Sequence, residues 1–205
     1  MTSYYLGFDV EATGEYHDLL SVAFTLCNKD GAVVEQKLFV IAPTPDGPFK
    51  PIHTDAVIDA KEDYKWSERC WEEFGRHHID VINATQNSKD AVRISFADAS
   101  HEIRKYFDYV CSEYSPLVGV DNAAFDSTYM NNLFCSDGEM PIEYQRTRDG
   151  SLVYEGITDY GSVLAYLRLN NRTEYDRVKE SVAVLNDHNP LNDSHRHALY
   201  LSKLY

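Results

Sequence analysis

Two acidic residues, Asp9 and Glu11, stand near the start of the chain in the segment FDVEATG, residues 8–14. In a strand, residues two apart project from the same face with Cα atoms about 7 Å apart, so both carboxylates point the same way. An unpaired pair of carboxylates on an inner strand is costly, and a divalent cation, which takes oxygen ligands, is the usual remedy. The spacing leaves two interpretations open: a metal site, or the acidic end of an edge strand that faces water.

A further acid, Asp126, follows the apolar run LVGV at residues 117–120. Such a run is typical of a buried parallel strand, and ligands bind α/β sheets at the carboxyl ends of their strands. Asp126 is expected near such an end, with Asp121 as a less favoured rival. The alternative is an ordinary acid in the first turn of a helix, where the helix dipole favours it.

A histidine and an acid, His188 and Asp193, lie at the start of the last predicted helix. A loop histidine five residues ahead of a helix-borne acid can lie beside the same cation and take a proton from water held there. The pair carries little weight alone, because roughly 0.7 such pairs are expected by chance in a chain of this composition.

The elements that position these residues begin with three strands, expected at residues 3–10, 19–27 and 33–41. The turn sequence NKDG at 28–31 joins the last two and predicts an antiparallel meander. Prolines at 43, 45, 48 and 51 then indicate an irregular loop.

Helices dominate the rest of the chain, with the buried strand 117–120 among them. They are predicted at residues 67–76, 96–113, 125–134, 159–169, 173–185 and 193–204. Asn192 or Asp193 is expected to start the last one. Strands first, followed by helices interleaved with buried strands, indicate an α/β domain with a mixed sheet.

Length and composition limit the classes of protein that remain. A chain of 205 residues suits one domain, residues 1–205. A net charge of −14 excludes a protein that coats DNA generally or binds membranes through a polybasic surface.

Targeting and redox signals are also sparse. With no run of 18 apolar residues and no charged leader followed by an apolar core, we expect neither a membrane span nor a signal peptide, and a cytoplasmic protein. The four cysteines, at 27, 70, 111 and 135, form no CxxC pair, so we expect small buried side chains and no zinc site.

Together the three motifs resemble those of the DEDDh family of 3′–5′ exonucleases, which includes ribonuclease T, oligoribonuclease and bacterial proofreading subunits. The matching positions are Asp9, Glu11, Thr13 and Gly14 for Asp-x-Glu-x-Thr-Gly, Asn122 and Asp126 for Asn-x-x-x-Asp, and His188 and Asp193 for His-x4-Asp. Residues 157–159 and the helix after them resemble the penultimate element of the family. The resemblance spans residues 3–205, although 42–95 match little.

This resemblance implies a ribonuclease H-like α/β fold, a mixed five-stranded sheet flanked by helices, and phosphodiester hydrolysis assisted by two ions, Mg²⁺ or Mn²⁺. Asp9, Glu11 and Asp193 would hold the first ion, and Asp9 with Asp126 the second. His188 would be the general base. The implied partner is the 3′ end of a single-stranded nucleic acid.

The resemblance also implies substrate contacts. Backbone near residues 12–14 would meet the terminal 3′-OH, and Trp71 and Phe74, three apart on one helix face, would stack on terminal bases. Core packing is the alternative for both rings. The full set of implied substrate-binding residues is Ala12, Thr13, Gly14, Asn122, Trp71 and Phe74. Members of the family often dimerise, and the sequence leaves a homodimer open.

The leading hypothesis is therefore a metal-dependent 3′–5′ exonuclease acting on single-stranded RNA or DNA. One alternative is a catalytically idle nucleic-acid-binding protein on the same fold, which would bind without turnover and tolerate a change at His188. Another is a non-nuclease protein with a structural cation such as calcium. His188 argues against that alternative because a calcium site needs no base, and the sequence contains no EF-hand loop.

Overall fold

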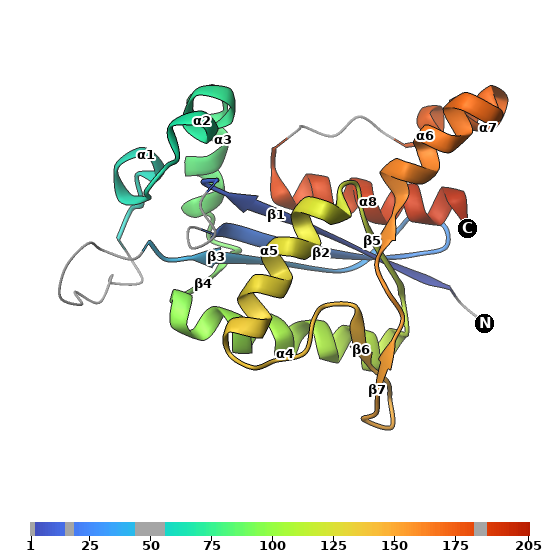
Figure 1. Cartoon of the computed structure of the whole chain (residues 1–205), viewed down its shortest axis with the longest axis horizontal. Helices are drawn as coiled ribbons and strands as arrows, with labels where there is room; N and C mark the ends of the chain where they lie inside the picture. Colours follow the sequence, from blue (N-terminus) through green and yellow to red (C-terminus); the bar gives the residue numbers. More distant parts are fainter. Residues whose placement is uncertain (1–2, 15–18, 44–55, 183–187) are drawn as a thin grey trace.

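A mixed β-sheet forms the centre of the computed structural model, which describes residues 3–14, 19–43, 56–182 and 188–205 (Figure 1). The described strands of this sheet are ordered β4-β3-β2-β1-β5-β8. Their bounds are Tyr4–Ala12 (β1), Leu19–Asn28 (β2), Val33–Ile41 (β3), Val92–Ile94 (β4), Leu117–Val120 (β5) and Thr158–Asp159 (β8).

The pairing of the strands confirms the predicted architecture. β1, β2 and β3 form the antiparallel meander, and β4, β5 and β8 add to it in parallel. Within the described residues the sheet has six strands instead of the expected five, because β4 joins its edge. Only three residues long, β4 is too short to produce a recognisable alternation in the sequence.

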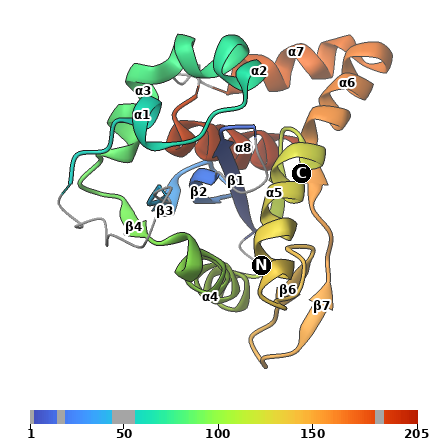
Figure 2. The same cartoon turned by 60° about the vertical axis from the view of Figure 1, so that its left-hand side comes forward.

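Helices cover both faces of the sheet. Figures 1 and 2 place α8 on one side of β1 and β2, with α4 on the other side. The helices are α1 (Ala60–Asp63), α2 (Glu68–Cys70), a π-helical turn (Trp71–Gly75), α3 (Arg76–Gln86), α4 (Phe96–Tyr114), α5 (Ala123–Ser136), α6 (Tyr160–Asn170), α7 (Arg172–Ser181) and α8 (Pro190–Leu204). None of the described helices has the length and apolar character needed to cross a bilayer.

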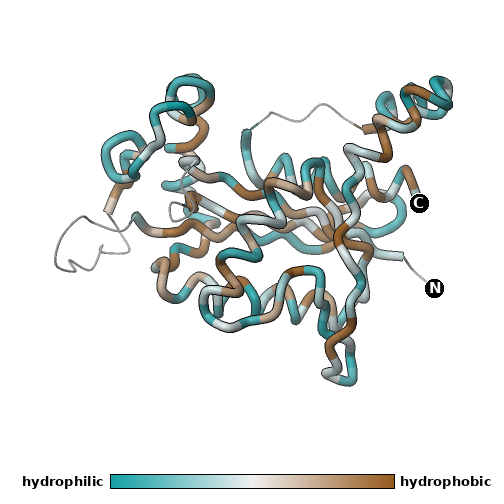
Figure 3. Tube along the Cα trace, viewed as in Figure 1, coloured by the Kyte–Doolittle hydropathy of each residue, from teal (hydrophilic) through white to brown (hydrophobic). Residues whose placement is uncertain are grey.

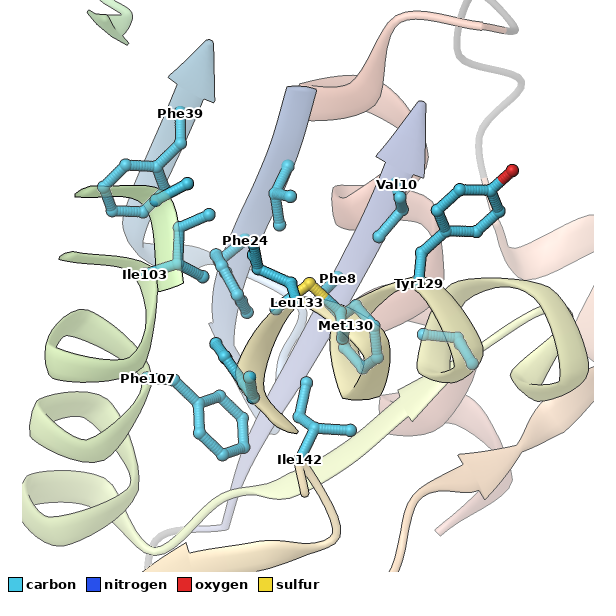
Figure 4. Packing of buried hydrophobic residues seen from close by; sticks show 14 of the residues in the cluster. Phe8, Val10, Phe24, Phe39, Ile103, Phe107, Tyr129, Met130, Leu133 and Ile142 are labelled. Atoms are coloured by element: carbon cyan, nitrogen blue, oxygen red, sulfur yellow. The ribbon is translucent and has the colours of Figure 1, made fainter. Parts of the chain in front are cut away.

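The main hydrophobic core lies between the sheet and helices α4 and α5. Phe8, Phe24 and Phe39 of the meander meet Phe107 of α4 and Met130 of α5 there (Figure 4). All are at most 2% exposed. Because side chains alternate along a strand, this face of β1 buries Phe8 and leaves the odd-numbered residues Asp9 and Glu11 on the opposite face, toward α8.

Several predicted helix boundaries are wrong. The helix expected at 67–76 continues through the π-helical turn and α3 to Gln86. The prediction ended too early because the inner face of α3 is partly polar: Thr85 and Gln86 are buried there beside Ile82. Figure 3 draws these upper-left helices mostly in teal, the hydrophilic colour. The last helix begins at Pro190, since Asn189 caps it by accepting hydrogen bonds from the backbone N–H groups of Leu191 and Asn192.

Other short elements were not predicted from the sequence. Helix α1 and the hairpin β6 (Tyr144–Arg146) and β7 (Leu152–Tyr154) had no clear periodicity. Part of the predicted proline loop (44–55) and the end of the predicted helix 173–185 lie outside the described residues.

The expectation for the cysteines holds only in part. Cys27 and Cys111 are buried, whereas Cys70 is half-buried and Cys135 is exposed near the end of α5. All four are free thiols.

Gly7 lets helix α8 lie directly against strand β1. A Cβ atom at this position would lie 2.1 Å from the carbonyl oxygen of Ser194 and 2.5 Å from the backbone nitrogen of Ala198. Ser194 also shares a 2.8 Å hydrogen bond with Thr25 of β2, so the helix is fixed across two strands. This close approach brings the first turn of α8 over the end of β1.

We expect Gly7→Ala to destabilise the protein by about 3 kcal/mol, because the added methyl group would meet backbone atoms that cannot move aside. The melting temperature should fall by roughly 6–12 °C. Gly138→Ala is the matched control, since a Cβ there meets nothing within 4 Å. Its loss should be limited to about 1 kcal/mol from the positive φ of that residue. Equal losses in the two variants would contradict the packing role of Gly7.

Candidate active site

Three carboxylates from two elements converge at the end of β1. Asp9 and Glu11 lie on β1, and Asp193 lies in the first turn of α8. One potential ligand atom from each lies within 4.8 Å of the other two. The predicted projection of Asp9 and Glu11 to one face is thus confirmed, and the contact at Gly7 explains how Asp193 reaches them.

Asp126 joins the same pocket from helix α5 but lies outside this group of three. It is 4% exposed, and its Oδ1 accepts a 3.1 Å hydrogen bond from the backbone N–H of Val10. That bond ties the start of α5 to β1 between the two strand carboxylates. Asp126 is therefore a first-turn helix acid, as its alternative interpretation held, and also part of the acidic pocket.

The pocket around these acids has a volume of about 350 Å³ and includes nine of the eleven predicted site residues. They are Asp9, Glu11, Ala12, Gly14, Phe74, Asn122, Asp126, His188 and Asp193. Thr13 and Trp71 do not belong to its described lining. Thr13 is fully buried and its carbonyl oxygen accepts from the Ser67 backbone N–H, whereas Trp71 packs edge-on against Trp66 with centroids 5.4 Å apart.

Gly14 lines the pocket at a tight turn of the backbone that follows β1. Its φ of 90° lies in the left-handed region, which favours glycine, and a Cβ atom would lie 2.5 Å from Ser67 Oγ and 2.7 Å from Cys70 Cβ. The end of β1 can therefore turn directly beneath the N-terminus of α2.

Burial makes the acidic cluster electrostatically unfavourable when no cation is bound. It raises the pKa of Asp9 well above its usual value, and the neighbouring charges of Glu11, Asp126 and Asp193 add to this. Burial likewise raises the pKa of Glu11, and it raises the pKa of Asp126 to about 7.

Oδ2 of Asp9 is buried and has no hydrogen-bond partner among the described residues. An orphaned carboxylate oxygen beside two further carboxylates suits a hard divalent cation, which binds oxygen ligands and offsets their repulsion. The side chains present therefore fit such an ion.

The raised pKa values predict that the metal-free protein loses stability as pH rises, whereas its stabilisation by Mn²⁺ increases. A carboxyl group whose pKa is about 7 when folded and about 3.9 when unfolded stabilises the fold fully below pH 4, and this contribution is lost as pH rises through 7. The metal-free protein should thus lose stability from pH 5 to 8. The increase in melting temperature caused by Mn²⁺ should grow over the same range, because the ion binds deprotonated carboxylates. Thermal melts at several pH values, with EDTA or with Mn²⁺, test both trends. Asp126→Asn is the matched control, and its melting temperature in EDTA should depend less on pH.

His188 lines the pocket just before α8, with a φ of 61°. Positive φ is uncommon for a residue other than glycine and is often found at functional sites. Its ring lies 5.0 Å from the ring of Phe74 and 3.9 Å from that of His78, measured between centroids. Phe74 lies in the π-helical turn and His78 one turn later, so one helix face contacts the histidine.

Several residues of this site were not predicted from the sequence. Cys70, Phe125, Arg196 and His197 also line the pocket, and His78 contacts His188. Arg196 follows Asp193 by three positions, a spacing that would have placed it on the same helix face. His78 carried no comparable signal, because its contact with His188 joins segments far apart in the chain.

His197 has a structural environment. It is fully buried, and its Nδ1 lies 2.8 Å from the carbonyl oxygen of Phe8. Burial lowers its pKa to about 4, so the ring remains neutral at physiological pH. It therefore connects α8 to β1 beneath the acidic cluster.

The sequence matches no protein-family model and no curated protein. Solved structures with a similar fold include three exonucleases. A product-bound exonuclease I shares 13% identity at a TM-score of 0.60, over 100% of this chain and 43% of the other. A full-length 3′-exonuclease shares 12% identity at a TM-score of 0.54, and the match covers 99% of this chain and 81% of the other. A 3′-exonuclease that specifically recognises the 3′ end of a histone mRNA stem-loop shares 11% identity at a TM-score of 0.51. That match covers 99% of this chain and 63% of the other.

The chain thus spans less than half of exonuclease I and under two thirds of the stem-loop-binding structure. At these identities the comparison concerns the fold, including the mixed sheet and its flanking helices. The chain has the ribonuclease H-like fold of the 3′–5′ exonucleases, and its acidic cluster lies at the end of the central strand.

Proposed function

We propose that this protein is a metal-dependent 3′–5′ exonuclease that removes nucleotides from the 3′ ends of single-stranded RNA or DNA, with residues 1–205 forming one exonuclease domain. The observation that carries the proposal is the convergence of Asp9, Glu11 and Asp193, whose potential ligand atoms lie within 4.8 Å of one another. The likeness to exonuclease folds supports it, because those proteins act on or recognise nucleic acid ends.

Asp9, Glu11 and Asp193 would hold one Mg²⁺ or Mn²⁺ ion, and Asp9 with Asp126 a second. Such ions, when bound, stabilise the charge that develops on a phosphodiester during in-line displacement. The backbone N–H of Val10 donates a hydrogen bond to the carboxylate of Asp126, so β1 fixes the position of that carboxylate.

His188 would be the general base. It lines the pocket, where a neutral imidazole can accept a proton from the attacking water. Contacts with Phe74 and His78 restrict the orientation of its ring. The base is therefore held by a helix that carries none of the four carboxylates.

The uncharged residues of the pocket lining are the candidates for contact with substrate. Ala12, Gly14, Asn122 and Phe74 are uncharged residues of the pocket lining and would contact the terminal nucleotide. Phe74 is the better-supported stacking residue, although it also packs partly against the hydrophobic cluster beside α3. Trp71, packed on Trp66, is less well supported.

Single-stranded RNA and DNA labelled at the 5′ end, incubated with Mn²⁺ and resolved at single-nucleotide steps, test this function. A ladder that shortens from the 3′ end would support it, and the faster strand would identify the preferred sugar. Strand binding without shortening would favour the alternative, an idle nucleic-acid-binding protein.

A further inference from the structure

Arg196 is a fixed positive charge inside the acidic pocket. Among the described residues that line the pocket, it is the only lysine or arginine. It follows Asp193 by one helical turn on α8, and its guanidinium Nη2 lies 2.5 Å from Asp193 Oδ1. The side chains are 23% and 6% exposed, so the ion pair is largely removed from water.

The charge of Arg196 acts on more than its immediate partner. Asp9, Asp121 and Asp126 line the same pocket as its guanidinium. Arg196 therefore partly neutralises the strand side of the cluster as well as Asp193. A buried group of carboxylates is otherwise strongly unfavourable, and arginine is the side chain best suited to a buried ion pair.

A divalent ion held by Asp9, Glu11 and Asp193 would meet this guanidinium at close range. A carboxylate whose charge is already balanced by the guanidinium of Arg196 attracts a divalent ion less strongly. The two cations also repel each other, and partial burial weakens solvent screening of that repulsion.

We propose that Arg196 is an internal counter-cation, which neutralises Asp193 in the metal-free protein and opposes the binding of the divalent ion there. The inference rests on the proposed function, since the ion is the one assigned to that site. Its consequence is a site that tolerates the absence of metal and binds metal more weakly than its carboxylates alone would.

An ordinary surface ion pair offers a matched comparison on helix α7. Glu174 and Arg177 have the same acid-to-arginine spacing, with 2.6 Å between Arg177 Nη2 and Glu174 Oε1. Their side chains are 37% and 53% exposed. Arg177→Gln therefore removes one arginine and one helical ion pair without touching the pocket.

Calorimetric titration with Mn²⁺, in the absence of nucleic acid, tests the proposal. Arg196→Gln should bind Mn²⁺ about tenfold more tightly than the unmodified protein, because a like charge is removed. Arg196→Lys, which keeps the charge, should stay within about threefold of it. Arg177→Gln should leave the affinity unchanged.

Thermal melts supply a second readout. In EDTA, Arg196→Gln should melt at a lower temperature than the unmodified protein, because its cluster has lost the counter-cation. Saturating Mn²⁺ should remove most of that difference. An Arg196→Gln affinity equal to or weaker than that of the unmodified protein would overturn the inference while leaving the proposed function intact. Failure of every protein, including the unmodified one, to bind Mn²⁺ would overturn both.

Discussion

Asp9→Asn is expected to lower nuclease turnover by at least about 10³-fold and to abolish most of the stabilisation by Mn²⁺. Asp9 is the one carboxylate assigned to both ions, and its buried Oδ2 has no hydrogen-bond partner among the described residues. Asparagine keeps the shape of the side chain but removes its charge. Loss of activity would therefore reflect the loss of a metal ligand, not a cavity.

The same variant should be more stable than the unmodified protein in EDTA. Burial and three neighbouring carboxylates disfavour the charged form of Asp9, and a neutral amide avoids this cost. An inactive variant that melts higher in EDTA but responds little to Mn²⁺ would be hard to explain by misfolding.

Asp30→Asn is the matched control, because it removes a carboxylate from the exposed turn between β2 and β3. Activity and the response to Mn²⁺ should be unchanged. If Asp9→Asn and the unmodified protein gain equally from Mn²⁺ in thermal melts, the metal site is not at Asp9.

The sequence predicted those parts of the site that depend on local geometry. Asp9 and Glu11 share a face because strand side chains alternate, and this holds wherever the strand packs. Asp126 could be placed because it follows a short buried strand, and ligand sites gather at such ends. His188 and Asp193 were assigned to the right loop and helix, although the helix begins earlier, at Pro190.

The parts that could not be predicted depend on contacts between distant segments. Nothing near His78 indicates that its ring meets His188, because that contact needs α3 and the loop before α8 to meet. The polar inner face of α3 likewise concealed its length.

The prediction for Trp71 and Phe74 assumed an ordinary α-helix. In the π-helical turn each residue advances by a smaller angle, so residues three apart no longer share a face as closely. Phe74 therefore lines the pocket, whereas Trp71 packs against Trp66.

Replacement of His188 by alanine should lower turnover by around 10²-fold or more while Mn²⁺ binding stays intact, because a positioned general base contributes about that much. His188 contributes no carboxylate to the cluster, so the melting temperature should rise with Mn²⁺ as in the unmodified protein. Single-turnover rates at saturating substrate, measured beside thermal melts, separate the loss of chemistry from the loss of metal or substrate binding.

His101→Ala is the control for this variant, since His101 is an exposed histidine on α4, away from the pocket. Its turnover should match that of the unmodified protein. Near-normal turnover of His188→Ala would mean that another group accepts the proton. An idle binding protein would instead give no turnover in either form and equal affinity for single strands, so the pair of variants distinguishes a wrongly assigned base from a protein that never was a nuclease.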